Sequence, residues 1–383
     1  MSANRKNILI VTASVGAGHT QAANAVAAAI HRHYPGNNVE TVDFMAEENS
    51  YFNTLVKETY LKMISLSPNV YDVLYRWSQA PRQYAKVENL MARAMKRTML
   101  RLYRRYRPDM IICTHPFPCG AAAYLRRTRM INVPLVAITT DFAVHQFWVY
   151  DEVDLYFVAG REMQDELVAR GVPARQVYSS GIPVDPSFGE ATDVGAISRD
   201  LGLVAEMPVV LVMSGGLGVG PVQDAILSID ACEQAFQIIV VAGNNTLLHR
   251  QLEQTAQVTR HQVSVLGYTQ RIRELMAVAD VLVTKPGALT LSEALALSLP
   301  MVLFSPLPGQ EEDNASYLVS HGAALWVDGV GRLGEIVSGL LAQPQRLARM
   351  RQNAARLGRP QAAAAVAKVI SDYLPHQVPA AGI

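Results

Sequence analysis

Residues 281–293 read Val-Leu-Val-Thr-Lys-Pro-Gly-Ala-Leu-Thr-Leu-Ser-Glu. An apolar, β-branched run ends in a Lys-Pro-Gly turn, and a stretch with helical spacing follows it. This order predicts a buried strand that turns directly into a helix. The free N–H groups at the start of that helix form a binding site for a pyrophosphate. One turn further on, the carboxylate of Glu293 is placed to accept hydrogen bonds from two ribose hydroxyls.

The same strand, turn and helix order recurs along the chain and predicts an α/β fold with parallel sheets. In the first half we expect strands at 7–13, 38–43, 109–113, 134–138 and 154–158, with helices near 18–34, 82–105, 119–129 and 161–170. In the second half we expect strands at 208–213, 237–242, 262–266, 280–283 and 300–304, with helices near 220–231, 245–257, 270–278, 288–297, 310–320, 332–342 and 345–357.

These elements form two Rossmann-like domains, 1–180 and 208–383. The intervening 181–207 is rich in Gly and Pro, which favours a hinge. We expect the domains to face each other across a cleft, because ligands of open parallel sheets bind outside the carboxyl ends of the strands. The strand-to-helix turns of both halves are therefore the places to look for functional residues.

Composition excludes several classes of protein. The chain has 383 residues, of which 50% are apolar and 17% charged, and its net charge is +1. A folded protein is expected, and a dedicated nucleic-acid binder is disfavoured. Three cysteines without metal-ligand spacing fit a reducing compartment and no disulfide framework. The apolar runs are too short for a signal peptide or a membrane-spanning helix.

The first turn of the chain, Ser-Val-Gly-Ala-Gly-His-Thr at 14–20, contains a candidate base. Gly18 lets the backbone approach a ligand, and His19 lies at the start of a helix. The helix dipole lowers the pKa of an imidazole there, which leaves it neutral and able to accept a proton. A dinucleotide fingerprint would need glycine at 21, where the chain has Gln21, although Asp43 after the next strand keeps a nicotinamide site open as an alternative.

Two further turns in the second half have the composition of ligand-binding loops. Residues 214–220 read Ser-Gly-Gly-Leu-Gly-Val-Gly, and Gly216 and Gly218 expose backbone N–H groups for a phosphate. No Lys-Ser/Thr pair follows, so this turn is not an ATP-type phosphate loop. Residues 306–314 form a polar cluster after the strand at 300–304, which suits hydrogen bonds to the hydroxyls of a sugar.

Taken together, these residues resemble the diacylglycerol glycosyltransferases of glycosyltransferase family 28, which include processive bacterial glucosyltransferases and monogalactosyldiacylglycerol synthases. The resemblance spans about 7–345. It is carried by Gly-x-Gly-His at 16–19, Thr-His-Pro-Phe-Pro at 114–118, Thr-Asp-Phe at 140–142 with His145 and Trp148, Gly-Ile-Pro-Val at 181–184, the glycine turn at 214–220, Gly267-Tyr268, Lys-Pro-Gly-x-x-Thr-x-x-Glu at 285–293 and Pro-Gly-Gln-Glu at 308–311.

The resemblance implies a two-domain glycosyltransferase B fold, a UDP-hexose donor and diacylglycerol as the acceptor. It places His19 and Asp141 at the reacting centre, and His145 and Trp148 on the acceptor side. It assigns the donor to Gly18, Gly216, Gly218, Gly267, Tyr268, Lys285, Gly287, Ala288, Thr290, Glu293, Gln310 and Glu311. Gly267 and Tyr268 would lie near uracil, Gly287 to Thr290 at the pyrophosphate, and Gln310 and Glu311 at the hexose. Ala288 departs from the family pattern, which often has glycine there.

The chemistry expected is an inverting transfer without a metal or other cofactor. Cleavage of the sugar–phosphate bond leaves negative charge on UDP, which fixed donors or a metal must stabilise. No Asp-x-Asp triplet occurs in the chain, so the helix start at 287–291 is the expected stabiliser. His19, or alternatively Asp141, would take the proton of the acceptor hydroxyl.

A basic segment predicts contact with a membrane surface. Nine Lys or Arg and one acid, Glu88, lie between 82 and 107. Several of them share adjoining faces of the predicted helix, namely Arg93, Arg97, Arg101, Arg104 and Arg105. Amphipathic aromatic residues are frequent between 51 and 84. We expect the protein to bind anionic lipids peripherally, at the cytoplasmic face of a membrane, without nucleic acid as a partner.

Two other functions share this fold and remain alternatives. One is transfer of N-acetylglucosamine from UDP-GlcNAc to a peptidoglycan lipid precursor, and the other is UDP-GlcNAc 2-epimerisation, whose substrate is water-soluble. The sequence leaves glucose and galactose undistinguished as the donor sugar, because they differ at a single hydroxyl. It also leaves open the oligomeric state and whether the enzyme glycosylates its own product.

Overall fold

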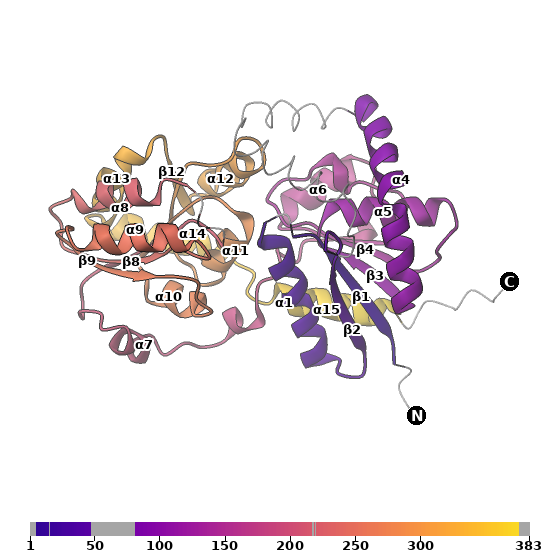
Figure 1. The fold of residues 1–383 in the computed structure, drawn as a ribbon, viewed down its shortest axis with the longest axis horizontal. Helices are drawn as coiled ribbons and strands as arrows, with labels where there is room; N and C mark the ends of the chain where they lie inside the picture. The colour runs from indigo at the N-terminus through magenta and orange to yellow at the C-terminus, as the bar shows by residue number, and fades with distance from the viewer. Residues whose placement is uncertain (1–4, 15, 47–80, 217, 219, 375–383) are drawn as a thin grey trace. The chain divides into compact units, whose positions relative to one another are not determined.

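The structure, a computed structural model, describes residues 5–14, 16–46, 81–216, 218 and 220–374, and only the backbone of 81–91. The chain divides into two compact units, Met1–Pro186 with Gln361–Ile383, and Ser187–Pro360. Each unit is a parallel β-sheet with helices on its faces (Figure 1).

The sheet of the first unit has the order β2-β1-β3-β4-β5-β6, and every described pairing in it is parallel. Its strands are β1 (Asn7–Thr12), β2 (Asn38–Asp43), β3 (Met110–Cys113), β4 (Leu135–Ile138), β5 (Leu155–Phe157) and β6 (Val177–Tyr178). Its helices are α1 (Gly18–His33), α4 (Pro81–Tyr106), α5 (Pro116–Arg127), α6 (Arg161–Ala169) and α15 (Ala362–Tyr373), with short 3₁₀ turns η1 (Gln146–Trp148) and η2 (Ala174–Gln176).

The sheet of the second unit has the order β12-β11-β10-β7-β8-β9, again parallel. Its strands are β7 (Val209–Met213), β8 (Gln237–Val241), β9 (Gln262–Leu266), β10 (Val281–Thr284), β11 (Met301–Phe304) and β12 (Ala324–Val327). Its helices are α7 (Val194–Asp200), α8 (Val222–Asp230), α9 (Thr246–Ala256), α10 (Ile272–Val278), α11 (Ala288–Ala296), α12 (Gln310–Ser320), α13 (Leu333–Leu341) and α14 (Pro344–Leu357), with 3₁₀ turns η3 (Pro186–Gly189), at the boundary between the units, and η4 (Val330–Arg332).

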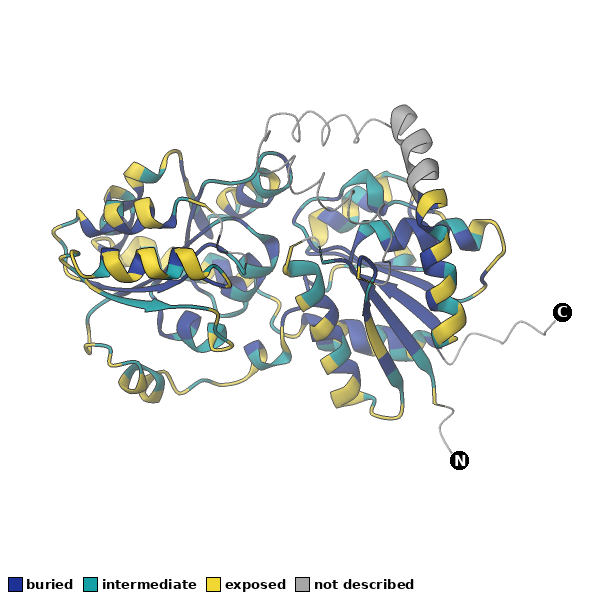
Figure 2. Ribbon diagram, viewed as in Figure 1, coloured by how far each residue is buried: buried dark blue, intermediate teal, exposed yellow. Residues whose placement is uncertain are grey.

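Burial explains why the strands were predictable. The central strands are buried on both faces, as in other parallel sheets, so they appear in the sequence as continuous apolar runs (Figure 2). All ten predicted strands are confirmed within one or two residues at their ends. Two edge strands, β6 and β12, were not predicted, because β6 has two residues and β12 is only partly buried.

The strand order reverses once in each sheet. In the first unit the chain moves from β1 to β2 on one side and then returns to β3 on the other side of β1. In the second unit it moves from β7 to β8 and β9, and then returns to β10 on the other side of β7. Connections diverge at such a point, which leaves a crevice at the carboxyl ends of the two strands where ligands bind.

The end of the chain differs from the predicted 208–383 domain. Helix α15 packs beside α1 in the first unit (Figure 1). Its residues Val366, Ala367 and Ile370 are buried in the same apolar core as Val26 and Ile30 of α1. The second unit therefore ends at Pro360, and the apolar face of the last helix is covered by the first unit.

The predicted hinge 181–207 is only partly correct, because the segment from Ser187 onward belongs to the second unit. It contains helix α7, which begins where the side chain of Asp193 accepts a hydrogen bond from the N–H of Ala196 at 2.9 Å. The guanidinium of Arg273 donates to the carbonyls of Glu190 and Ala191, both at 2.9 Å. The Arg273 contacts are tertiary, so the Gly and Pro content of the segment did not indicate them.

A buried carboxylate stabilises the second unit at the end of α8. Asp230 accepts hydrogen bonds from the N–H groups of Arg260 and His261, and its Oδ1 lies 2.9 Å from His261 Nδ1. Burial raises the pKa of Asp230, but these hydrogen bonds outweigh that effect and bring the pKa below its ordinary value. The carboxylate therefore contributes stability above the ordinary Asp pKa, and this contribution is lost as the pH falls through the lowered pKa.

Replacing this carboxylate should destabilise the protein. Asp230→Ala leaves the N–H groups of Arg260 and His261 and the His261 ring without their acceptor, so we expect the free energy of unfolding to fall by about 2 kcal/mol near neutral pH. Urea denaturation measures it. Asp224→Ala is the matched control, since Asp224 is exposed in the first turn of the same helix and should cost less than about 1 kcal/mol. Equal losses in both variants would contradict the role of Asp230.

Candidate active site

His19 lies at the point of strand reversal in the first unit. It is the second residue of α1, directly after the turn that follows β1. Its neighbour is Thr114, the first residue after β3, whose hydroxyl donates to the carbonyl of His19 at 3.0 Å. Asp43, the last residue of β2, accepts hydrogen bonds from the N–H groups of Ser14 and Met45. Asp43 was the residue that left a nicotinamide site as an alternative. Its carboxylate instead accepts hydrogen bonds from the backbone of this turn and of the residues after β2.

The hydrogen bonds of His19 fix which ring nitrogen carries the proton. Nδ1 lies 2.9 Å from the carbonyl oxygen of Thr114 and 2.7 Å from Oγ1 of Thr140, the second residue after β4. A carbonyl can only accept, so Nδ1 is the protonated nitrogen and donates to Thr114. Nε2 then holds the free electron pair of the neutral ring, which is the arrangement of a general base.

The lowered pKa of His19 keeps the ring neutral near neutral pH. Burial lowers it from 6.5 to about 4, although the hydrogen bond to the Thr114 carbonyl acts in the opposite direction. The ring of His115 packs edge-on against it, with the centroids 4.5 Å apart, and burial followed by the charge of His19 lowers the pKa of His115 as well. The predicted direction of the His19 shift is confirmed, while its largest cause is burial, not the helix dipole.

The other predicted residues of the first unit lie along the same edge of the sheet. Asp141 is half-buried and directly follows Thr140, the partner of His19. His145 Nδ1 accepts a hydrogen bond from the N–H of Phe147 at 3.1 Å, which caps η1. Trp148 is only 3% exposed. It is therefore part of the core of the first unit and leaves little of its ring exposed for contact with an acceptor, on whose side it was expected.

The glycine turn after β7 is shaped by close packing against the loop after β8. Gly218 has φ +60°, and a Cβ there would lie 2.2 Å from the carbonyl oxygen of Ala242. Its N–H already donates to the carbonyl of Gly215 at 3.1 Å, and its carbonyl accepts from the Asn245 side chain at 2.9 Å. The glycine at 218 is thus explained by packing. The carbonyl of Gly216 likewise accepts from the N–H of Asn244.

Ser214, at the start of this turn, has no hydrogen-bond partner for its hydroxyl among the described residues. It is 7% exposed, and its hydroxyl is one of the few buried side-chain polar atoms of the described residues without a hydrogen bond. An unsatisfied buried hydroxyl costs free energy unless a ligand or water completes it. Gly220, at the other end of the turn, lies against Lys285, with the Cδ atom 3.3 Å from where a Cβ would be. The turns after β7 and β10 are therefore adjacent.

The turn after β10 opens α11 as predicted. Gly287 is the residue before the helix, and no atom lies within 4 Å of where its Cβ would be. No side chain caps the helix start, so its first N–H groups lack a side-chain acceptor. Ala288 is buried, whereas Thr290 and Glu293 are half-buried on the first turns. A helix start of this kind has the polarity that favours an anion.

Lys285 and the loop after β11 meet at this helix start. Lys285 Nζ lies 3.7 Å from Glu311 Oε2, which also accepts from the N–H of Leu307 at 2.6 Å. Asn314, almost fully buried, donates to the carbonyl of Pro286 at 3.3 Å. Gln310, the first residue of α12, is half-buried. The structure therefore brings the 285–293 and 308–314 motifs together.

Tyr268 is the exposed aromatic residue of this edge. It follows β9 and is 60% exposed, while the preceding Gly267 lies near the ring of His249. Both residues are at the carboxyl end of their strand, as the motif predicted. An exposed ring at this place can stack on a base.

The basic segment forms helix α4, as predicted. Arg93, Arg97, Arg101, Arg104 and Arg105 are exposed, whereas the opposite side of the helix is buried. The aromatic residues between 51 and 84 fall outside the residues whose side chains the structure describes. No described helix combines the length and the apolar composition that crossing a membrane requires.

Four further residues belong to these two clusters and were not assigned a role from the sequence. Thr114, His115 and Thr140 surround His19, and Ser214 adds a hydroxyl at the start of the turn after β7. The first three lie one or two residues after predicted strands. Knowledge of the strand order would therefore have placed them beside His19. The burial of Ser214 has no signal in the sequence.

Comparison with known proteins identifies the family. Residues 19–184 match the family model of monogalactosyldiacylglycerol synthase, and residues 209–368 match that of the glycosyltransferase family 28 C-terminal domain. The processive diacylglycerol beta-glucosyltransferase of Bacillus licheniformis is 32% identical over 91% of this chain and 90% of its own. The chain belongs to the diacylglycerol glycosyltransferases of family 28. The predicted family is thereby confirmed.

Solved structures support the fold of this family 28 member. MurG of Acinetobacter baumannii aligns with a TM-score of 0.63 at 16% identity, covering 96% of this chain and 99% of its own. Anabaena HepE, crystallised with UDP-glucose, aligns with a TM-score of 0.57 at 16% identity, covering 96% and 100%. The fold is glycosyltransferase B, as expected. The fold alone does not distinguish diacylglycerol glycosylation from N-acetylglucosamine transfer to a peptidoglycan precursor or from UDP-GlcNAc 2-epimerisation. The family match favours diacylglycerol glycosylation over the other two.

The unpaired hydroxyl of Ser214 generates a prediction. If it donates to a donor phosphate, Ser214→Ala should raise the dissociation constant for UDP roughly 10-fold, because a hydrogen bond to a charged group is lost. Thermal stability should not fall, since the hydroxyl has no hydrogen-bond partner in the part of the chain that the structure describes. Isothermal titration and a melting curve measure the two quantities.

Ser292→Ala is the matched control. Ser292 is buried on α11, but its hydroxyl donates to the carbonyl of Ala288 at 2.8 Å. We expect this variant to bind UDP like the parent protein. An unchanged dissociation constant in Ser214→Ala would remove Ser214 from the donor site.

Proposed function

We propose that this protein transfers a hexose from a UDP-sugar to the free hydroxyl of diacylglycerol, with inversion at the anomeric carbon. The neutral, oriented imidazole of His19 is the observation that carries the proposal. Further support comes from the uncapped helix start at Gly287 and from the diacylglycerol acceptor in the name of the Bacillus licheniformis relative. Its "beta" product agrees with inversion of an α-linked UDP-sugar.

The proton chemistry follows from the His19 tautomer. As the glycerol oxygen forms its bond to the anomeric carbon, Nε2 takes the hydroxyl proton. The imidazolium then has a proton on each nitrogen, and the Thr114 carbonyl stabilises the one on Nδ1. Asp141, next to Thr140, is proposed to orient the acceptor or the imidazolium, with His19 as the base. The bond from the anomeric carbon to the UDP oxygen breaks in the same step.

The leaving group departs with an additional negative charge. In the proposal, the N–H groups of Ala288 and Thr290 and the Lys285 ammonium stabilise it, while Glu293 binds the ribose and Tyr268 the uracil. Gly18, Gly216 and Gly267 are proposed to allow close approach of the donor. These groups provide fixed positive charge where it is needed, so we propose a transfer independent of metal. Gln310 and Glu311 are proposed to bind the hexose, which is glucose or galactose.

The acceptor requires the enzyme to work at a membrane surface, because diacylglycerol does not leave the bilayer readily. We propose that the basic face of α4 binds anionic lipids of the cytoplasmic leaflet, with His145 near the acceptor. Each basic group near an anionic surface contributes about 1 kcal/mol, so several together are sufficient for reversible docking. This docking is peripheral.

The assay of the proposal uses vesicles that contain diacylglycerol, each UDP-hexose in turn, and mass spectrometry of the lipid product. We expect a monohexosyl diacylglycerol. His19→Ala should lower kcat by roughly 10²–10⁴-fold while the dissociation constant for UDP stays the same. The control is His31→Ala, an exposed histidine in the last turn of α1. Full turnover in His19→Ala would refute His19 as the base.

The pKa of His19 provides an independent readout. Because the folded pKa is about 4, the neutral base persists as the pH falls through the ordinary value of 6.5 and is lost only near 4. In histidine-labelled protein, the His19 resonances should not titrate across the ordinary histidine range. A His19 midpoint close to 6.5 would contradict the burial argument.

Membrane docking is tested by charge removal. Replacing Arg93, Arg97, Arg101 and Arg104 by Gln should abolish sedimentation with anionic vesicles at low salt, since about four favourable contacts are lost. Four exposed arginines in and just after α14 give a matched control, namely Arg346, Arg349, Arg356 and Arg359. Retained sedimentation of the α4 variant would place docking elsewhere on the protein.

A further inference from the structure

Two oxygen atoms approach the same ring nitrogen of His19, although one acceptor is enough to fix its proton. Nδ1 lies 2.9 Å from the carbonyl oxygen of Thr114 and 2.7 Å from Oγ1 of Thr140. The carbonyl already determines the tautomer, so the shorter contact, to Thr140, needs a separate explanation. Because Nδ1 carries the proton, the Thr140 oxygen can only accept from it, and the hydroxyl proton of Thr140 points elsewhere.

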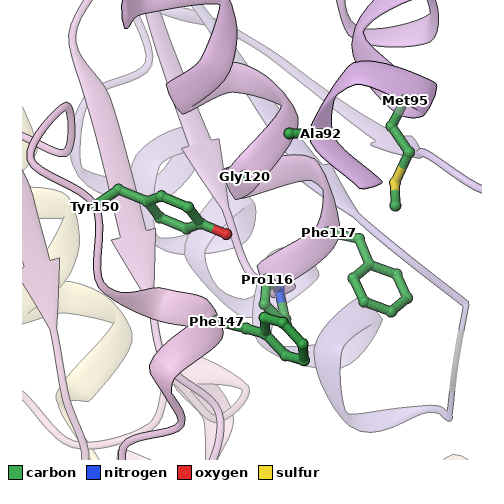
Figure 3. A pocket seen from close by; sticks show the side chains of 7 residues that line it. All are labelled: Ala92, Met95, Pro116, Phe117, Gly120, Phe147 and Tyr150. Carbon is green, nitrogen blue, oxygen red and sulfur yellow. The ribbon is translucent and has the colours of Figure 1, made fainter. Parts of the chain in front are cut away.

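The Thr114 side of this contact is firmly held. The Thr114 hydroxyl donates to the carbonyl of His19 at 3.0 Å, so two hydrogen bonds join these residues. Helix α5 begins at Pro116, two residues later. A Cβ at Gly120 of α5 would lie 2.5 Å from the hydroxyl oxygen of Tyr150, and Figure 3 shows the Tyr150 ring directed at this helix. Such close packing leaves the start of α5 little room to shift, so the Thr114 carbonyl is a fixed acceptor.

The Thr140 side is held by the end of β4. The preceding residue, Thr139, donates from its N–H and from its hydroxyl to the carbonyl of Phe157 in the neighbouring strand β5, at 2.9 and 3.3 Å. Thr139 is 1% exposed and Thr140 is 6% exposed. Two adjacent, buried threonines thus use their hydroxyls differently. One hydroxyl binds the backbone of the sheet, and the other contacts the candidate base.

The partners of Nδ1 are uncharged. A carboxylate at this nitrogen would strongly favour the imidazolium and raise the pKa of His19, whereas a carbonyl and a hydroxyl stabilise the imidazolium without a full charge. The ionisable side chain that packs on the ring is His115, whose own pKa burial and then the charge of His19 lower. Of the carboxylates at neighbouring strand ends, Asp43 accepts from backbone N–H groups, and the half-buried Asp141 follows Thr140 in the chain.

We propose that Thr140 is a positioning residue, whose hydroxyl oxygen is the second acceptor of the Nδ1 proton and stabilises it most when the ring of His19 becomes charged. The inference rests on the proposed function and adds how the base is assisted. Positive charge develops on the ring only as Nε2 forms its bond to the proton of the acceptor hydroxyl. A hydrogen bond with a charged donor is roughly twice as strong as a neutral one, so Thr140 favours the transition state over the resting enzyme.

The test removes the Thr140 hydroxyl with little change in the size of the side chain. Thr140→Val should lower kcat about 10-fold, because a hydrogen bond to a charged group is lost from the transition state. The dissociation constant for UDP should stay the same, since the donor residues lie in the second unit. Thr140→Ser keeps the oxygen and should restore kcat to within about two-fold of the parent value.

Thr139→Val is the matched control. It removes a buried hydroxyl at the same strand end, but one that donates to the Phe157 carbonyl and not to the base. We expect a lower melting temperature and a parent-like kcat. The inference is overturned by a parent-like kcat in Thr140→Val, or by losses of kcat that are equal in the two valine variants. Melting curves show that each variant is folded at the assay temperature.

Nuclear magnetic resonance of histidine-labelled protein tests the contact without turnover. In Thr140→Val the titration midpoint of His19 should fall below that of the parent by up to about one pH unit, which corresponds to the 10-fold change in kcat. A raised midpoint would show that Thr140 donates to Nδ1, and an unmoved midpoint that it makes no such bond; both overturn the inference. If acid unfolds a variant, the nitrogen-15 shift of Nδ1 at neutral pH replaces the midpoint, and it should change in Thr140→Val but not in Thr139→Val.

These measurements separate the inference from the proposed function. A parent protein that glycosylates no lipid with any UDP-hexose, but whose His19 midpoint falls in Thr140→Val, would reject the proposed function and leave Thr140 as the second acceptor. A parent protein that forms the glycolipid, but whose His19 midpoint does not fall in Thr140→Val, would reject the inference and leave the proposed function.

Discussion

The reversal of strand order in each sheet is the constraint on which the candidate site depends. Where β3 returns beside β1, and where β10 returns beside β7, the connecting helices diverge and leave the carboxyl ends of two strands uncovered. His19 and Thr114 meet at the first reversal. Lys285 and the turn that starts at Ser214 meet at the second. Parallel strand pairing, and not long loops, thus assembles each of these groups of candidate residues within its own unit.

The chemistry of His19 shows how position becomes reactivity. A histidine on the surface is partly protonated near neutral pH, and its two tautomers exchange. Here the carbonyl of Thr114 holds the proton on Nδ1, and burial keeps the ring neutral. The same burial makes folding less favourable in acid, because the unfolded chain takes up a proton near 6.5 and the folded chain only near 4. This loss of stability in acid arises at His19, the residue proposed to act as the neutral base.

The sequence predicted those features that depend on local pattern. Buried parallel strands are continuous apolar runs, and Gly or Pro turns mark their ends, so both sheets and the turns that hold His19 and Gly287 were found. Features that depend on tertiary docking were not. The return of α15 to the first unit, the partners of His19 across β3 and β4, and the burial of Trp148 require the strand order and the packed core, which no local window contains.

Helix α4 links several features of the first unit. Its buried face, with Ala92, Met95, Met99 and Leu102, belongs to the core of the first unit, and the helix packs on α5. Helix α5 begins at the His115 cap and so fixes Phe117 and the ring that touches His19. The outer face of α4 has the exposed arginines. One helix thus has the arginines proposed to bind lipid on its exposed face, while its buried face packs on the helix whose start positions the ring beside His19. The residues proposed to bind the donor lie in the second unit, so they can differ with the sugar without a change in this packing.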